Sequence, residues 1–331
     1  MSAAVQGPDL SPYTSCRLCP RNCGVNRVAG ERGVCGEEAV CRVASWGPHY
    51  GEEPCFSGTR GSGTIFFSGC SSGCFFCQNY QISAEHHGRD RTPEDLLQAA
   101  LEMAAGPDAV HNINFVTPDH FWPHVRWLAQ RLRQEGVTLP LLFNGSGYER
   151  PELVPEYAEW MDIFLPDFKF ADPALAKRVM GDARYPELVL ASLRKMVELK
   201  GFLSPWDPTG RETARQGVLV RHLILPGEVE NSLAVLSRLR QEFGPLLPLS
   251  VMSQFRPVPA CAGRGDLARR ISGEEHVRVI GHAEALGFRH LFIQQHEDSA
   301  DFMPDFRADH VFRGNREIKG KKGTEGAKGA R

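Results

Sequence analysis

Between residues 64 and 294 the apolar positions form two alternating kinds of pattern. Short runs of β-branched and aromatic residues are typical of buried strands, whereas longer segments carry apolar residues at helical spacing. The short runs predict strands over residues 64–67, 113–117, 139–144, 161–166, 217–225, 247–253 and 290–294. The longer segments predict helices over residues 92–105, 118–135, 149–159, 173–200 (one or two helices), 232–242 and 273–286.

The alternation of strands with helices determines the predicted fold class. Repeated strand–helix units imply right-handed crossovers and a parallel sheet, so the class is α/β. Six or seven units suit an incomplete (β/α)6-type barrel, whereas a closed eight-fold barrel needs more units. A doubly wound parallel sheet remains the alternative. The segment 201–216 is polar and contains Pro205 and Pro208, which is typical of an insertion or a lid.

The ends of the chain differ from this central pattern. Residues 1–13 are interpreted as a disordered leader, and residues 14–57 as a small cysteine-rich metal-binding segment. A Gly/Ser/Arg-rich linker over residues 52–63 leads into the barrel, which is expected to span residues 58–305. Residues 306–331 are interpreted as a basic disordered tail, because the Gly/Lys-rich part after position 312 carries seven basic and two acidic residues.

Composition narrows the class of protein. The 331 residues include 38 basic and 40 acidic ones, so the formal net charge is −2 and nucleic-acid binding is not expected. The start of the chain has neither a basic nor an apolar targeting region, and no run approaches the ~18 apolar residues of a membrane span. We therefore expect a cytoplasmic chain with no membrane partner. In that compartment clustered cysteines are better explained as metal ligands than as disulfides.

Three of the ten cysteines, Cys70, Cys74 and Cys77, stand on one Gly/Ser-rich loop directly after the first predicted strand. Three thiolates on a compact loop can bind three iron atoms of a [4Fe–4S] cluster, since cysteine is the usual ligand of such clusters. No fourth cysteine follows nearby, so the fourth iron would be open to a small molecule. The spacing also allows a zinc site with a distant fourth ligand, a disulfide with one free thiol, or three buried cysteines.

A second set of four cysteines precedes the barrel and consists of Cys16, Cys19, Cys23 and Cys35. Glycines and a proline between them suit tight turns around a metal. Four thiolates can close a zinc site or hold a second [4Fe–4S] cluster, and reduced or disulfide-linked cysteines are also possible. The remaining three, Cys41, Cys55 and Cys261, stand alone and are interpreted as small buried apolar residues.

The sequence around the first set, Cys-x3-Cys-x-Phe-Cys-x-Asn after a glycine-rich strand, resembles the signature of the radical S-adenosylmethionine (radical SAM) superfamily. It is most similar to the pyruvate formate-lyase activating enzymes and their iron–sulfur relatives, over about residues 16–305. The resemblance implies a partial barrel in which the open iron binds the amino and carboxylate groups of S-adenosylmethionine. One electron from the cluster then cleaves the sulfonium and yields a 5′-deoxyadenosyl radical.

Polar residues follow or end several of the predicted strands. In a barrel these carboxyl ends face one site. Collected polar groups there make a site for a charged, hydroxyl-bearing ligand such as S-adenosylmethionine, although any one of them could by itself be a loop cap. The residues are Thr117, Asn144, Asp167, Arg221 and Gln254.

The resemblance gives some of these residues a role. Phe76 matches an aromatic position against the adenine, and Arg221 matches a strand arginine that contacts the cofactor. Asn144 and Asp167 match aspartates that help to bind a monovalent cation in activating enzymes, so Asn144 removes one expected cation ligand. Thr117 stands where these enzymes carry a Gly-Gly-Glu-Pro segment that meets the methionine amino group, so that contact is altered or moved.

The predicted function is therefore a radical SAM enzyme that abstracts hydrogen from a substrate. The resemblance suggests a glycine of a partner enzyme, because a glycine radical is stabilised between the amide nitrogen and the carbonyl. A reducing electron donor such as flavodoxin or ferredoxin is also implied. The alternative is a metal-binding adaptor or nucleic-acid-binding protein that uses the N-terminal cysteines and the basic tail, although the central region lacks a stacking face of aromatic and basic residues.

Overall fold

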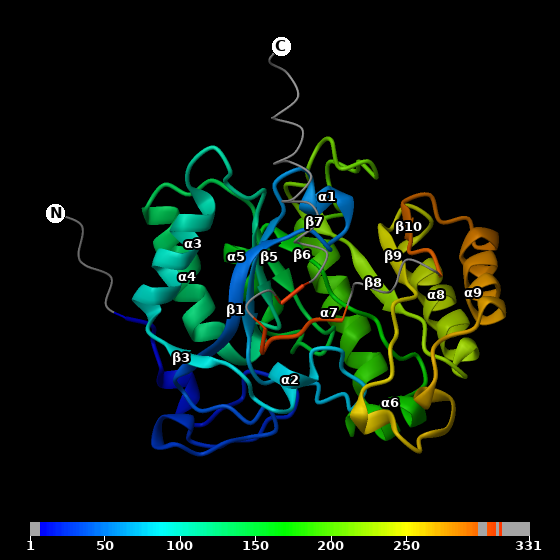
Figure 1. Cartoon of the computed structure of the whole chain (residues 1–331), viewed down its shortest axis with the longest axis horizontal. Helices are drawn as coiled ribbons and strands as arrows, with labels where there is room; N and C mark the ends of the chain where they lie inside the picture. Colours follow the sequence, from blue (N-terminus) through cyan, green and yellow to red (C-terminus); the bar gives the residue numbers. More distant parts are fainter. Residues whose placement is uncertain (1–6, 297–302, 309–310, 313–331) are drawn as a thin grey trace, which may run out of the picture.

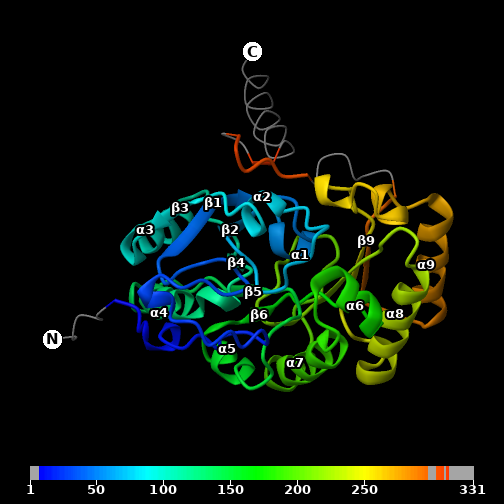
Figure 2. The same cartoon turned by 90° about the horizontal axis from the view of Figure 1, so that it is seen from below.

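The computed structural model of the chain describes residues 7–296, 303–308 and 311–312. A curved wall of mainly parallel strands forms its centre, and the long helices lie outside this wall (Figures 1 and 2). The predicted α/β class and incomplete barrel are confirmed. The strands that match the predicted runs are β2 (Ser62–Phe67), β4 (Ile113–Val116), β5 (Leu141–Asn144), β6 (Ile163–Phe164), β7 (Gly217–Val218), β8 (Val220–Leu223), β9 (Leu249–Met252) and β10 (Leu291–Ile293).

The strands are arranged in two sheets that join where β7 is followed by β8. One sheet has the order β3-β1-β2-β4-β5-β6-β7, and the other has the order β10-β9-β8. From β2 to β7, and from β8 to β10, neighbouring strands are parallel. The single strand predicted over residues 217–225 is thus divided in two, and a backbone bridge between Asp167 and Arg221 links β8 to the chain after β6. The carboxyl ends of these parallel strands therefore lie on one side of the wall.

The helices occupy the predicted segments. They are α3 (Pro93–Ala104), α4 (Trp122–Gln134), α5 (Val154–Trp160), α6 (Pro173–Met180), α7 (Tyr185–Lys200), α8 (Val229–Phe243) and α9 (Gly273–Ala285). The start of α3 follows from its sequence, because Thr92 and Asp95 form a capping box that satisfies two free backbone amides. No helix among residues 7–296, 303–308 and 311–312 is long and apolar enough to cross a membrane.

The structure contains a strand that the sequence pattern did not predict. Strand β1 (Cys41–His49) pairs antiparallel with β2 on one side and with the short β3 (Arg89–Arg91) on the other. The cysteine-rich segment is therefore joined to the main sheet rather than standing apart from it. The predicted linker over residues 52–63 is also corrected, because it contains helix α1 (Pro54–Ser57) and the start of β2.

The two ends of the chain are more ordered than predicted wherever they are described. Residues 11–13 form a short 3-10 helix, and Tyr13 is completely buried, so the predicted disordered leader is wrong for residues 7–13. Phe306 is also buried, at 4% exposure, which corrects the start of the predicted disordered tail. Residues 1–6, 297–302, 309–310 and 313–331, which include most of that tail, lie outside the described residues.

The predicted insertion or lid over residues 201–216 lies away from the cysteine loop. Leu203 and Ala214 are buried in a cluster that includes Leu142 and Ile163, which stand near the amino ends of β5 and β6. The amide of Ala214 donates to the carbonyl of Cys55 in α1 at 2.9 Å. The segment and α1 together fill the amino-terminal end of the barrel, so the interpretation as a lid is wrong.

Candidate functional site

The cysteine loop, residues 68–79, connects β2 to α2 (Tyr80–Ser83) at the carboxyl end of β2. Gly69 has a φ of +76°, and a Cβ atom there would lie 2.6 Å from the carbonyl oxygen of Cys35, so this close approach requires glycine. Farther along the loop, the Ser71 hydroxyl donates to the Asp119 carboxylate at 2.5 Å. The loop is thus held from two sides by residues distant in the sequence.

The three thiols of the cysteine loop line one cavity of about 450 Å³. None of these cysteines is in a disulfide. Burial, with smaller contributions from Asp119 and Cys77, raises the pKa of Cys70 to about 12. Burial likewise raises the pKa of Cys74 to about 12, although Lys169 opposes that rise. Metal binding would supply the positive charge that stabilises these buried groups as thiolates, so the donor set fits a [4Fe–4S] cluster.

The residues predicted to bind the cofactor all line the same cavity. Phe76 lies in the cysteine loop, and most of the others lie at or after the carboxyl ends of strands, as the barrel requires, whereas Arg221 is the second residue of β8. Their contacts with a bound cofactor remain predictions. These other residues are Thr117 after β4, Asn144 at the end of β5, Asp167 after β6, Arg221 on β8 and Gln254 after β9.

Phe76 and Thr117 are held in position by neighbouring parts of the fold. Phe76 packs edge-to-face against Phe170 and Phe255, with ring centroids 6.2 and 5.7 Å away. Thr117 has a φ of +57°, a conformation that is uncommon for a residue with a side chain. The amide of Thr117 donates to the carbonyl of Asn144 at 2.8 Å, which extends the pairing of β4 with β5 by one residue.

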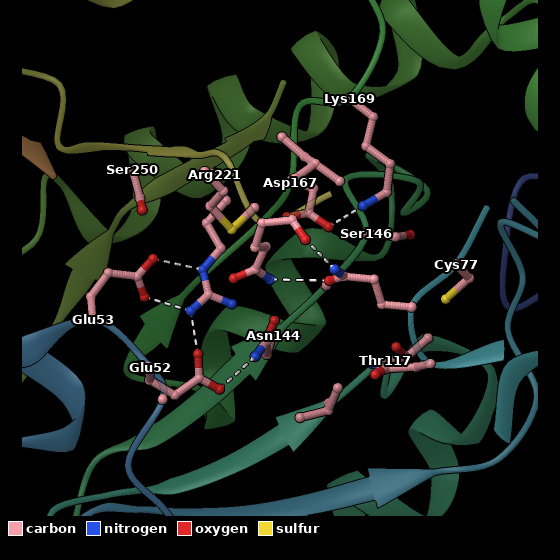
Figure 3. Close-up of a pocket in the computed structure, with 18 of the residues that line it drawn as sticks. Glu52, Glu53, Cys77, Thr117, Asn144, Ser146, Asp167, Lys169, Arg221 and Ser250 are labelled. Atoms are coloured by element: carbon pink, nitrogen blue, oxygen red, sulfur yellow. Dashed lines mark hydrogen bonds and ion pairs between the residues drawn. The ribbon is translucent and has the colours of Figure 1, made fainter. Parts of the chain in front are cut away.

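Arg221 makes contacts that the sequence did not predict. Its guanidinium binds both carboxylate oxygens of Glu53, at 2.9 and 2.5 Å, and also pairs with Glu52 (Figure 3). Glu52 in turn accepts hydrogen bonds from the side-chain amides of Asn114 and Asn144, at 2.9 and 3.3 Å. Two carboxylates therefore hold the arginine, and its contact with the cofactor stays a prediction.

The charges at this end of the cavity are deeply buried. Burial alone would lower the pKa of Arg221, but the carboxylates of Glu52 and Glu53 raise it well above its ordinary value. The pKa of Glu52 is lowered even though burial opposes this, because Arg221 and His49 favour its charged form. The arrangement carries one positive and two negative charges, so a further anion would be repelled here.

Asp167 and Lys169 form an ion pair on the cavity wall between this charged end and the cysteine loop (Figure 3). Burial opposes the charge on Lys169, but Asp167 and Cys74 raise its pKa above the ordinary value. The Tyr185 hydroxyl donates to the backbone carbonyl of Asp167 at 2.9 Å and accepts from the amide of Lys169 at 2.9 Å. The pair therefore presents a fixed cation and a fixed anion near the thiols.

Gln254 belongs to a row of side-chain amides along the cavity. The side-chain NH2 of Gln78 donates to the backbone carbonyl of Gln254 at 2.5 Å, and that of Gln294 donates to the Gln254 side-chain oxygen at 3.0 Å. Gln78 stands in the cysteine loop, and Gln294 follows β10. The row thus connects the loop to the last strands with uncharged donors and acceptors.

The N-terminal cysteines lie behind the cysteine loop. Arg21 donates to the backbone carbonyls of Ser71 and Ser72 at 2.9 and 2.7 Å, which ties the N-terminal segment to the loop. Cys16, Cys19 and Cys35 are each 8% exposed. These three thiols are buried in the packed interior, whereas the thiols of the cysteine loop face a cavity.

The thiols of neither cysteine set are gathered around a single point in this structure. Throughout the described part of the chain, no three His, Cys, Asp or Glu side chains are gathered closely enough to hold one metal ion. A zinc site would require its sulfur atoms to lie about 2.3 Å from one point. The cysteines of a cluster instead bind different iron atoms, so the spacing of the first set suits a cluster better than zinc. The metal of the second set remains a prediction. The lone cysteines Cys41, Cys55 and Cys261 are completely buried, as predicted.

Sequence reasoning missed the acidic residues of the cavity. Glu52 and Glu53 stood in a segment interpreted as a linker, yet both line the cavity. Gln78, His49 and Asn114 were also not predicted to take part. The one available signal was Arg221 itself, because a charged residue inside an apolar strand needs an opposite charge that local sequence does not supply.

The chain is similar to one family model, to a protein of known sequence and, more distantly, to two solved structures. The model of the Radical SAM superfamily matches residues 64–238. An uncharacterized protein of Methanocaldococcus jannaschii is 26% identical over 276 residues, which cover 82% of this chain and 75% of that protein. Among solved structures, methylornithine synthase (PylB) has a TM-score of 0.48 and 13% identity, covering 79% of this chain and 80% of that one. SuiB from Streptococcus suis, solved bound to S-adenosylmethionine, has a TM-score of 0.43 and 10% identity, covering 68% of this chain and 47% of that one.

Proposed function

Because the chain belongs to the radical SAM superfamily, we propose that it is an enzyme that takes a hydrogen atom from a glycine of a partner protein. Enzymes of this superfamily use a [4Fe–4S] cluster and S-adenosylmethionine. The observation that carries the assignment is that Cys70, Cys74 and Cys77 line one cavity together with the strand-end residues. When bound, the cluster supplies one electron that cleaves the sulfonium and so generates the 5′-deoxyadenosyl radical, which removes hydrogen from the substrate.

The side chains of this cavity suit the two ends of S-adenosylmethionine. Phe76 offers an aromatic surface for the adenine, and the Asp167–Lys169 pair offers a cation for a carboxylate and an anion for an amine. Arg221, with its two glutamates, stands on the other side of the cavity from Cys77 (Figure 3). We assign that end to hydroxyl groups or to the substrate, because its net negative charge disfavours a carboxylate.

Two arguments support a glycine of a protein as the substrate. One is the chemistry of the glycine radical, and the other is the set of side chains on the cavity wall. The Cα–H bond of glycine is weakened because the radical product is stabilised between an amide nitrogen and a carbonyl. The row of Gln78, Gln254 and Gln294 offers uncharged donors and acceptors of the kind that pair with a peptide backbone. We further propose that flavodoxin or ferredoxin supplies the electron. The adaptor alternative is not favoured, because the family match covers the central region that an adaptor would leave unexplained.

The test follows hydrogen from glycine. The reconstituted enzyme is incubated without oxygen with S-adenosylmethionine, a reductant and proteins from the organism that makes this chain, grown on glycine deuterated at Cα. Protein and small-molecule fractions are supplied separately. We expect the 5′-deoxyadenosine formed with the protein fraction to be one mass unit heavier. Formation of 5′-deoxyadenosine with no label from protein would overturn the glycine assignment, and no cleavage of S-adenosylmethionine in any arm would overturn the enzyme assignment.

A further inference from the structure

The wall of strands is open on one side. Among the described strands, β10 pairs only with β9, and β3 pairs only with β1, so a gap separates these two edges. The last described residues, 303–308 and 311–312, are named here the gate segment. In Figures 1 and 2 this segment (orange-red) runs beside α2, on the side of the molecule where the wall is open. A stretch of chain that forms no strand therefore occupies part of the gap.

Two aromatic residues attach the gate segment to the inside of the wall. The ring of Phe306 lies 5.3 Å from that of Phe66 on β2, and the ring of Phe312 lies 5.6 Å from Phe66 and 4.1 Å from His49. Phe306 is buried in a small apolar cluster with Phe66, Ile82 and Val116. This cluster is separate from the main core, although Met303 at the start of the gate segment packs against that core.

The gate segment forms part of the functional cavity itself. Phe312 lines the cavity together with Phe66 and with Phe292 of β10. These three residues come from β2, from the edge strand β10 and from the gate segment. Phe312 therefore forms part of the cavity wall on the open side of the barrel.

The polar contacts between the gate segment and α2 resemble the binding of a peptide. The backbone amide of Phe306 donates to the side-chain oxygen of Gln81 at 2.7 Å, and the Gln81 side-chain NH2 donates to Asp305 at 3.2 Å. Gln81 lies in α2, directly after the cysteine loop. Arg307 pairs with Glu85 at 2.6 Å, but both side chains are well exposed, so this pair stabilises little.

We propose that the gap between the edges at β3 and β10, beside α2, is a binding site for a polypeptide that folds back in a turn, and that the gate segment, in which the amide of Asp305 donates to the carbonyl of Val311 at 2.9 Å, occupies this site in cis until the substrate displaces it. Gln81 binds the backbone of the bound polypeptide, and the site holds one aromatic side chain against Phe66 and another against His49. The ligand is a peptide because the present occupant is one, held by its backbone and by two aromatic rings. A small molecule bound near the thiols would not replace the ring of Phe306 in its cluster with Phe66.

This inference rests on the proposed function in assuming that the substrate is a protein, and its tests need neither a cluster nor turnover. In the first test the metal-free full chain reacts with iodoacetamide or with a bulky polyethylene-glycol maleimide. Peptide mass mapping then counts the labelling of Cys70, Cys74 and Cys77 alone. We expect F306A and F312A to raise labelling by the bulky reagent roughly ten-fold or more, because loss of a buried ring favours local opening. Iodoacetamide labelling should change by less than about two-fold, since the small reagent already reaches the cavity.

Two variants serve as controls. F292A removes the same ring from the opposite wall of the cavity and should leave the ratio of the two labelling rates unchanged. R307A removes only the exposed pair and should also behave as the parent protein. If F292A opens the cavity to the bulky reagent as much as F312A does, or if no variant changes the ratio, then the segment is not a gate.

The second test asks whether the site binds a peptide. A fluorescent peptide with the sequence of residues 303–312 is titrated into the full-length F306A/F312A protein and into the parent, and anisotropy is measured. We expect the double variant to bind the peptide at least roughly ten-fold more tightly than the parent, whose site is filled in cis. A control peptide with both phenylalanines changed to alanine should lose this binding. Equal binding to both proteins, or no binding to either, would overturn the proposal, whether or not the enzyme cleaves S-adenosylmethionine.

Discussion

The two cysteine sets lie next to each other but in different surroundings. Cys70, Cys74 and Cys77 are only partly buried and line a cavity, whereas Cys16, Cys19 and Cys35 are buried behind the same loop. The two sets are linked through Arg21 and through the contact of Gly69 with Cys35. The surroundings therefore differ in what they allow: thiols with access to a cavity can take part in chemistry, and thiols packed behind it are placed to support the loop, directly or through a structural metal.

The comparison of the two sets leads to a general expectation about substitutions. Changes on the cavity side should alter chemistry with little effect on folding, and changes on the packed side should alter stability. Buried ionisable residues such as Arg221 and Glu149 test the limits of that division, because a charge without a partner costs stability wherever it is buried.

The largest effect is expected on the cavity side. Changing Cys70, Cys74 or Cys77 to alanine should abolish cleavage of S-adenosylmethionine, because each thiolate would hold one iron and two rarely keep the cluster intact. Chromatography of 5′-deoxyadenosine after anaerobic reaction measures this. Cys261→Ala, which removes a lone buried thiol, is the control and should retain activity. A wild-type rate in any one of the three variants would refute the assignment.

The second expectation concerns metal on the packed side. A chain with Cys70, Cys74 and Cys77 all changed to alanine should still contain about one zinc or about four iron atoms, held by Cys16, Cys19, Cys23 and Cys35. A closed set of four thiolates needs no free coordination position, so this metal should be structural. Anaerobic metal analysis of the purified variant checks the prediction. Finding neither metal would remove the second site and leave the N-terminal thiols as packing residues.

A third expectation concerns Arg221, a buried charge on the cavity side whose removal should lower stability. Arg221→Ala should lower the free energy of unfolding by about 3–5 kcal/mol, because it leaves the carboxylates of Glu52 and Glu53 buried without their cation. Denaturant unfolding measures the loss. A triple variant with glutamine at all three positions should recover much of the stability, since it buries no charge. An unchanged midpoint for Arg221→Ala would mean that the cavity is wetter than the structure indicates.

The smallest expected effect is a pH dependence of the free energy of unfolding, caused by Glu149 on the packed side. Glu149 is completely buried, and burial raises its pKa from 4.5 to about 8, with Asp119 adding to the rise. Because the folded-state pKa lies above the unfolded one, the stability contribution is fully present below pH 4.5 and is lost as the pH rises toward 8. Glu149→Gln should remove this slope, a difference of roughly 2–4 kcal/mol between about pH 4 and about pH 9.

Unfolding by urea at several pH values tests this expectation. The matched control is Glu156→Gln, which changes a glutamate of α5 that is paired with Arg126 near the surface. Its slope should equal that of the parent protein. Parallel pH profiles for Glu149→Gln and the parent would show that the carboxyl of Glu149 is not buried in solution.

The strands and helices of the barrel could be predicted because local pattern reflects burial. The apolar run ending at Phe67 is buried on both faces, which is the property of strands in a parallel sheet covered by helices. Strand β1 escaped prediction because its exposure is irregular and it contains Gly47 and Pro48, which are typical of loops. Its pairing with β2 depends on β2 being present beside it.

The sequence predicted which loop and which strand ends line the cavity. It did not predict the ion pairs inside the cavity. The spacing of Cys70, Cys74 and Cys77 indicated their chemistry, and the strand ends placed Asn144 and Asp167 beside them. The partners of Arg221 could not be predicted, because Glu53 lies 168 residues away in the chain. Charges at that separation meet only when the whole wall has formed.

By itself the sequence determined the order of strands and helices, the loop that carries the three thiols and the side of the wall on which the polar residues gather. Local spacing and burial are sufficient for these features. The tertiary structure decided that Glu52 and Glu53 hold Arg221, that the N-terminal cysteines lie against the loop from behind, and that Phe312 lines the cavity. Each of these contacts joins segments that only the folded chain brings together, so no local pattern could record them.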